Sequence, residues 1–219
     1  MGPADIPEPE KQAEHRQTDS ARESHTDFMG ELMTLLKAGK DSTDKGKSGT
    51  RIENHGQIEA MAFPDGWVAG KPQANPGIGT RSYREVYRKD HPDTAVSFFY
   101  RGLPVSNEAA LSFRDVLSKA PHELTEQEKK SLADVLSTKT PVASDQFAMS
   151  SCRTEDLNGK KVLVVEGQYT QSGDKIHAVY VDADGSGRFV QEIFYQSAKD
   201  QYDTYWKGAQ SAFKSIDWK

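Results

Sequence analysis

Hydrophobic and polar residues alternate most regularly in the last third of the chain, beyond Pro141. Four segments there are rich in β-branched and aromatic residues and follow the two-residue period of a strand. They span residues 144–157, 160–171, 176–183 and 188–197. Asn158 and Gly159 connect the first two segments, and both residues tolerate the positive φ angles of a type I′ turn. The pattern predicts an antiparallel meander of four strands.

The last segment, residues 199–218, changes to a helical period. Its large apolar side chains recur every three or four positions, so they fall on one face of a helix. They are Tyr202, Tyr205, Trp206, Ala209, Phe213 and Ile216. A face this aromatic needs a partner surface, and the meander before it offers one. We expect this helix to lie on the sheet and to be required for folding.

The middle of the chain predicts three further strands, at residues 57–63, 80–89 and 94–102. In residues 80–89 neither face is wholly apolar, because Arg84, Val86 and Arg88 share one face, so we expect an edge strand. The sequence Phe-Pro-Asp-Gly-Trp at 63–67 favours a corner, with Pro64 at the second position of a type I turn.

Two helices are predicted between these strands and the meander. Residues 106–120 begin at Ser106, whose hydroxyl suits the N-cap position. Residues 125–138 begin with a capping box, in which Thr125 and Glu128 satisfy each other's backbone amides. The side chains that we expect these helices to bury are Leu111, Phe113, Leu117, Leu132, Val135 and Leu136.

Residues 1–50 differ in composition from the rest of the chain. They hold 7 basic residues, 10 acidic residues and a single Phe, Tyr or Trp, Phe28, which predicts a mobile acidic tail. Within this tail, residues 26–38 place Phe28, Leu32 and Leu36 at helical spacing, so we expect one amphipathic helix. This helix either packs on its own domain or docks on another protein. We expect the remaining residues, 51–219, to form a single α+β domain.

Charge and hydropathy exclude several classes of function. Residues 51–219 carry 21 basic and 23 acidic residues, and such a nearly neutral domain lacks the basic stripe that binds nucleic acid. No apolar run approaches the ~20 residues that span a membrane. The first residues lack the basic and apolar regions of a signal peptide, and the single cysteine, Cys152, leaves no internal disulfide. We therefore expect a cytoplasmic protein, with a mature exported form as the alternative.

The chain contains no local signature of a metal or cofactor site. Asp182 and Asp184 open a segment that resembles a calcium loop, but Ile193 stands where that loop needs a glutamate. We expect a plain hairpin turn there. The histidines lack the spacing of zinc ligands, and the glycines of residues 75–79 do not open a helix as a phosphate loop does. The sequence therefore predicts no metal and no cofactor.

Catalysis would need residues that only the fold can bring together. Cys152 could act as a nucleophile with His177 as its base, but we expect its thiol to be a small buried side chain. Glu166 shares a strand face with Val162 and Val164, and we expect it to reach solvent at the end of that strand. We predict no catalytic residue.

The order of these features resembles a known family. The Phe-Pro-Asp-Gly-Trp corner, a central helical segment, the hairpin in Gly-Lys-Lys-Val-Leu-Val-Val-Glu-Gly-Gln-Tyr and the closing helix before Phe-Lys-Ser-Ile-Asp-Trp are similar to the PsbP/Mog fold. This resemblance covers residues 52–219 and transfers no functional residue. It implies a largely antiparallel sheet with helices on both faces, and a role in binding proteins.

Two hypotheses about function follow from the sequence. The first is a noncatalytic interaction domain that binds another protein through its aromatic edge or its N-terminal helix. The candidate partner-binding residues are Phe28, Leu32, Leu36, Tyr83, Tyr87 and Tyr100. The second hypothesis is a hydrolase or transferase whose site forms only in three dimensions.

Overall fold

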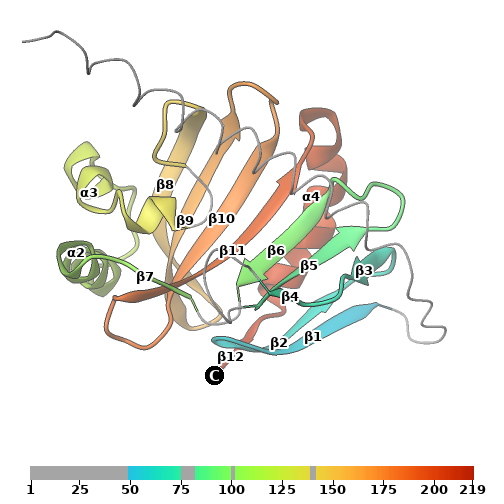
Figure 1. The fold of residues 1–219 in the computed structure, drawn as a ribbon, viewed down its shortest axis with the longest axis horizontal. Helices are drawn as coiled ribbons and strands as arrows, with labels where there is room; N and C mark the ends of the chain where they lie inside the picture. The colour runs from blue at the N-terminus through green and yellow to red at the C-terminus, as the bar shows by residue number, and fades with distance from the viewer. Residues whose placement is uncertain (1–48, 75–81, 100–101, 139–141) are drawn as a thin grey trace, which may run out of the picture. The chain divides into compact units, whose positions relative to one another are not determined.

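A nine-stranded antiparallel sheet forms the centre of the computed structural model, which describes residues 49–74, 82–99, 102–138 and 142–219 (Figure 1). The strands along its main path are, in spatial order, β3 (Trp67–Ala69), β5 (Ser82–Arg88), β6 (Ala95–Phe99), β11 (Phe189–Ser197), β10 (Lys175–Asp182), β9 (Lys160–Tyr169) and β8 (Phe147–Leu157). Two short strands lie off this path: β4 (Gln73–Ala74) pairs with β5, and β7 (Leu103–Pro104) pairs with β11. The predicted antiparallel meander, β8 to β11, is confirmed.

A second sheet of three strands lies beside the first. It contains β1 (Thr50–His55), β2 (Ile58–Phe63) and β12 (Asp217–Trp218), with β2 in the middle. The strand predicted at 57–63 is therefore present, but it does not belong to the same sheet as the meander. Because β12 follows the last helix directly, the C-terminal end of the chain is held by pairing with β2.

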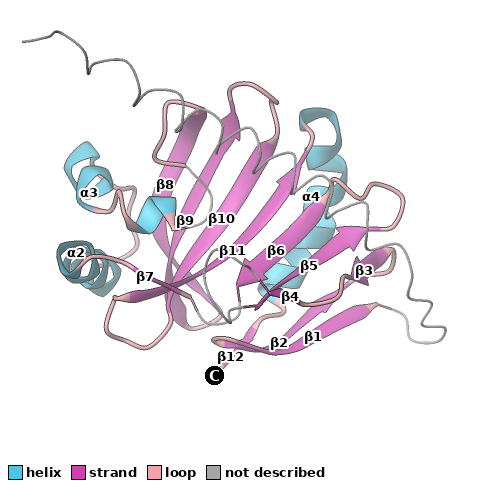
Figure 2. Cartoon of the chain, viewed as in Figure 1, coloured by secondary structure: helices cyan, strands magenta, loops and turns pink. Residues whose placement is uncertain are grey.

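Helices cover both faces of the large sheet (Figure 2). On one face lie α2 (Asn107–Ser118), α3 (Glu126–Ser131) and the short 3₁₀ helix η1 (Val135–Ser137). The helix α4 (Lys199–Lys214) crosses the opposite face, as Figure 1 shows. The predicted α+β architecture with helices on both faces is confirmed.

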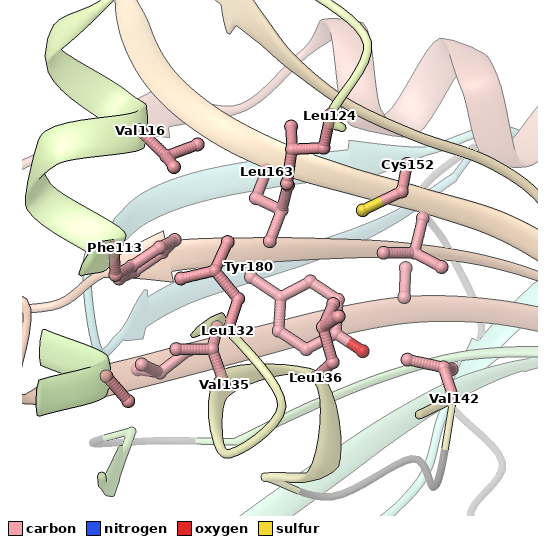
Figure 3. Close-up of a cluster of buried hydrophobic side chains, with 14 of the residues drawn as sticks. Phe113, Val116, Leu124, Leu132, Val135, Leu136, Val142, Cys152, Leu163 and Tyr180 are labelled. Atoms are coloured by element: carbon pink, nitrogen blue, oxygen red, sulfur yellow. The ribbon is translucent and has the colours of Figure 1, made fainter. Parts of the chain in front are cut away.

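The first of two hydrophobic cores, here called the α2-side core, lies between the sheet and α2, α3 and η1 (Figure 3). Figure 3 shows Phe113 and Val116 of α2 pointing toward side chains of the sheet and of the segment that contains η1. The thiol of Cys152 lies in this cluster, as does the ring of Tyr180. Both residues are fully buried.

The second core, here called the α4-side core, lies on the other face of the sheet. It contains Ala209, Ala212 and Phe213 of α4 together with side chains of β2, β9, β10 and β11. Side chains alternate between the two cores along β10, where Val179 contributes to the α4-side core and Tyr180 to the α2-side core. Because helices cover both faces of the sheet, side chains on both faces of β9 can be apolar, and this strand need not alternate polar with apolar residues.

The predicted helix caps and the Asn158-Gly159 turn are confirmed. Ser106 accepts a hydrogen bond from the Ala109 amide, and Thr125 forms its capping box with Glu128. Asn158 and Gly159 have φ angles of 52° and 83°, as a type I′ turn requires. The Asn158 side chain also donates to the Phe213 and Ile216 carbonyls at 3.1 and 2.9 Å, which ties this hairpin to the end of α4.

Three local predictions are wrong. Leu111 lies on the outer side of α2 and is 67% exposed, because Ala109, Ala110 and Phe113 supply that helix's buried face. The strand β5 is not an edge, since β3 and β4 pair with it on the side away from β6. The second helix ends at Ser131 instead of 138. Leu132, Val135 and Leu136 are buried as expected, but they lie beyond this helix, in the segment that contains η1.

The corner at 63–67 exists with a different register. The Trp67 amide donates to the Pro64 carbonyl, so Pro64 is the first residue of the turn rather than the second. Gly66 then occupies the third position with a φ of +85°, which is the type II geometry that favours glycine. Trp67 is presented to the α4-side core and is buried there.

Candidate functional site

Three ionisable side chains meet on the α4 side of the sheet, where β8, β9 and β10 run side by side. Glu166 and His177 are cross-strand partners in β9 and β10, and His177 Nδ1 lies 2.9 Å from Glu166 Oε1. Arg153 of β8 places its two Nη atoms 3.1 and 3.3 Å from the two oxygens of the same carboxylate. We call Arg153, Glu166 and His177 the charged cluster.

Aromatic rings of α4 cover one end of the charged cluster. The Trp206 and Phe213 rings lie 4.6 and 5.2 Å from the His177 ring, between ring centroids. Tyr202, one helical turn before Trp206, stacks on it with an interplanar angle of 13° and centroids 5.8 Å apart. We call Tyr202 and Trp206 the aromatic platform, and both side chains are half-buried.

Paired charges surround the aromatic platform. The Lys175 ammonium lies 5.1 Å from the centre of the Tyr202 ring and 3.6 Å from the Asp203 carboxylate. In the charged cluster, Arg153 also contacts Glu155 at 3.2 Å. The site therefore has an apolar centre and a rim of charges that are already compensated.

The electrostatics of the charged cluster keep Glu166 ionised. Its hydrogen bond to His177, followed by those from Arg153, lowers the pKa of Glu166 from 4.5 to about 2, against the opposing effect of burial. A carboxylate held in this way accepts hydrogen bonds from two side chains and has no proton to donate near neutral pH. This state suits a structural ion pair better than a general acid.

The Glu166–His177 pair has the geometry of an acid that orients a catalytic histidine, but the histidine is inaccessible. Its exposed fraction is 6%, and two rings of α4 pack against it. A general base must reach the proton that it abstracts. The arrangement fixes the position of the His177 ring and covers it with α4.

The structure does not bring Cys152 and His177 together as a nucleophile and its base. Cys152 points into the α2-side core (Figure 3), whereas His177 faces α4 on the other side of the sheet. Burial raises the pKa of the Cys152 thiol to about 12, so the thiolate is not formed near neutral pH. The expectation of a small buried side chain is confirmed.

The turn between β10 and β11 satisfies its own carboxylates, as a plain hairpin turn does. Asp182 accepts hydrogen bonds from the amides of Gly185 and Gly187 at 3.0 and 2.9 Å. Asp184 accepts from the amide of Ser186 at 3.0 Å.

Across the described ranges, no group of three or more His, Cys, Asp or Glu side chains is arranged to hold a metal ion. Within the same ranges, no helix has the length and apolar character needed to cross a bilayer.

The residues predicted to bind a partner are placed only in part. Phe28, Leu32, Leu36 and Tyr100 lie outside the described residues, as do residues 1–48 of the acidic tail and residues 75–79. Tyr83 and Tyr87 belong to β5, inside the sheet, and Tyr87 is half-buried. The role of both tyrosines in binding a partner stays a prediction.

Sequence reasoning missed Arg153 and Lys175, although a signal for the cluster existed. The Asn158-Gly159 turn fixes the register of β8 against β9, and the next turn fixes β9 against β10. That register puts Glu166 opposite His177 and close to Arg153. The half-exposed state of Trp206 could not be predicted, because the helical period shows which face of α4 is buried but not where the sheet beneath that helix ends.

Comparison with known proteins gives structural similarity at low sequence identity. No protein-family model matches the chain, and no curated protein matches it. Cyanobacterial PsbP from Synechocystis sp. PCC 6803 matches with a TM-score of 0.47 and 14% identity, over 82% of this chain and 98% of that one. PA94 of Pseudomonas aeruginosa, a protein of unknown function, matches with a TM-score of 0.38 and 11% identity, over 79% of this chain and 99% of that one. A PsbP protein is thus among the structures to which the chain is similar, and membership of the PsbP/Mog family stays a prediction.

Proposed function

We propose that the chain is a noncatalytic domain that binds another protein through the aromatic platform. The observation that carries this proposal is the stacked, half-buried pair Tyr202 and Trp206 at the surface of α4. Tyrosine and tryptophan are enriched at the centres of protein interfaces, where they supply large contact area with few rotatable bonds. The partner would place an apolar side chain against these two rings.

The surroundings of the aromatic platform support this proposal. His177 and Phe213 pack behind Trp206, so the ring is already ordered before a partner arrives. A preordered side chain loses little conformational entropy on binding. The rim charges of Lys175 and Asp203 neutralise each other, which lowers the cost of desolvating that part of the surface.

A hydrolase or transferase is the weaker alternative. The groups that would carry it are in unsuitable states, since Glu166 is ionised by two partners, His177 is covered and Cys152 is a buried thiol on the other face. The same contacts give Glu166 and His177 a structural role: they join β9 and β10 to α4 beneath the aromatic platform.

Site-specific photocrosslinking tests the proposal. The full chain would carry photoreactive benzoylphenylalanine in place of Tyr202, with a matched control in place of the exposed Leu111 on α2. We expect the probe at position 202 to crosslink one protein reproducibly in an extract of the native organism, and the probe at 111 not to crosslink it. Equal crosslinking at both positions, none at 202, or turnover in a broad substrate screen would contradict the proposal.

A further inference from the structure

Arg84 carries a positive charge that the structure leaves uncompensated. It lies on β5 between Tyr83 and Glu85, and its Nε atom is buried without a hydrogen-bond partner in the described ranges. Over the same ranges, its guanidinium forms no ion pair with any carboxylate. Arg153, which is also half-buried, differs from Arg84 because its guanidinium binds Glu155 and Glu166.

The neighbours of Arg84 add to the positive charge. His55, at the end of β1, packs edge-on against Phe98 with ring centroids 5.0 Å apart, and Phe98 is the cross-strand partner of Arg84. Lys219 is held nearby, because its amide donates to the Gln57 carbonyl at 2.9 Å. Burial first, and then the charges of Arg84 and Lys219, lower the pKa of His55 to about 4. Two cations, Arg84 and Lys219, therefore act on His55 at this end of the two sheets.

The nearest acid along the strand is turned away from this region. Glu85 follows Arg84 in β5, so its side chain points to the opposite face, where it accepts a hydrogen bond from Ser97 at 3.3 Å. Burial raises the pKa of Glu85, with no cation among the causes. Arg84 and Glu85 thus do not neutralise each other.

A buried N–H group without a partner, such as the Nε–H of Arg84, is costly and calls for an explanation in a native structure. The planar fork of a guanidinium matches the oxygens of a carboxylate or phosphate, to which arginine donates two hydrogen bonds. We propose that Arg84, within β5 and close to His55 and Lys219, binds a small oxyanion. This site is separate from the aromatic platform and does not depend on it.

Binding of the anion should change the protonation of His55. Burial, and then the charges of Arg84 and Lys219, keep His55 neutral, and a negative charge next to Arg84 would offset those charges and favour protonation of the imidazole. The pKa of His55 should therefore rise when the site is filled. This response distinguishes binding at Arg84 from nonspecific screening, which acts on exposed histidines as well.

The test uses inorganic phosphate as the probe on the full-length chain. Imidazole resonances are followed by NMR from pH 3.5 to 7.5 with 20 mM phosphate, and separately with acetate or chloride, at equal ionic strength. We expect phosphate or acetate to raise the pKa of His55 by at least half a unit and the melting temperature by a few degrees. Comparing the response to acetate with the response to phosphate tells whether the site binds a carboxylate or a tetrahedral anion.

Two variants locate the effect. Arg84→Gln should abolish both responses, whereas Arg51→Gln, which removes an exposed arginine of β1, should leave them intact. If Arg84→Gln does not fold, Arg84→Lys keeps the charge but loses the fork, and we expect it to weaken the response at least fivefold. Equal shifts in chloride, or shifts that survive in the Arg84 variants, would overturn the proposal.

Discussion

Removing the Phe213 ring should destabilise the domain more than any exposed substitution on its helices. Phe213 lies in the last turn of α4, is 3% exposed and packs against His177 and Trp206 at centroid distances of 5.2 and 6.3 Å. The substitution Phe213→Ala leaves a cavity between α4 and the sheet. It also removes the ring that supports the aromatic platform from behind.

The magnitude follows from burial and ring contacts. Burying a phenylalanine fully contributes about 2 to 3 kcal/mol, and aromatic contacts add about 0.5 to 1.5 kcal/mol. We therefore expect Phe213→Ala to lower the free energy of unfolding by about 3 to 4 kcal/mol, within the usual range for such a truncation. With a urea dependence of about 2 kcal/mol per molar, the unfolding midpoint falls by about 2 M.

Urea unfolding followed by tryptophan fluorescence is the assay. The chain has three tryptophans, and Trp67, Trp206 and Trp218 all belong to or pack against the α4-side core, so the signal reports on the face that is perturbed. Leu111→Ala is the control, because Leu111 is exposed and its loss should stay within about 0.5 kcal/mol. A loss below 1 kcal/mol in Phe213→Ala would refute the packing of α4 described above.

Three further predictions concern single positions. The Cys152 thiol should react with a thiol reagent at least about 100-fold more slowly in buffer than in urea, and rapid labelling of the folded chain would contradict its burial. Gly187→Ala should lower the free energy of unfolding by at least about 1 kcal/mol more than Gly173→Ala in the same assay. Both glycines have positive φ, but of the two only Gly187 would place the added methyl group against a carbonyl of α2. Equal losses for the two variants would contradict that close approach. Glu166→Gln should cost on the order of 1 to 2 kcal/mol at pH 7, after allowance for solvent screening. Because the folded pKa of Glu166 is lowered to about 2, the difference from the native chain should shrink in thermal scans as the pH falls from 4.5 toward 2, and a constant difference would rule out the ion pair.

The parts of the fold that could be predicted are those with strong local signals. The Asn158-Gly159 turn and the alternation around it indicate the meander, and Thr125 with Glu128 marks the start of α3. The period of α4 indicates its buried face, with Ala209 and Phe213 at the centre. In each case the residues that specify the element lie within it or directly beside it in the sequence.

The parts that were missed depend on pairing between distant segments. The strands β3, β4, β7 and β12 have two or three residues each, too few to show any period, yet β3 and β4 decide that β5 is not an edge. The division into two sheets likewise depends on β12 returning to β2 from the other end of the chain. Leu111 was misplaced because helical spacing alone does not tell which of two apolar stripes faces the sheet.

The proposed binding surface is tested most directly by reversing a charge at its rim. Asp203 is 82% exposed and pairs with Lys175 beside the Tyr202 ring, while Glu126 on α3 is 89% exposed and pairs with Lys129. The affinity of the crosslinked partner, once purified, would be measured by calorimetry for Asp203→Lys and for the matched control Glu126→Lys. We predict that Asp203→Lys weakens binding at least tenfold and Glu126→Lys less than twofold. Equal affinities for the two variants would contradict the assignment of the aromatic platform as the binding surface.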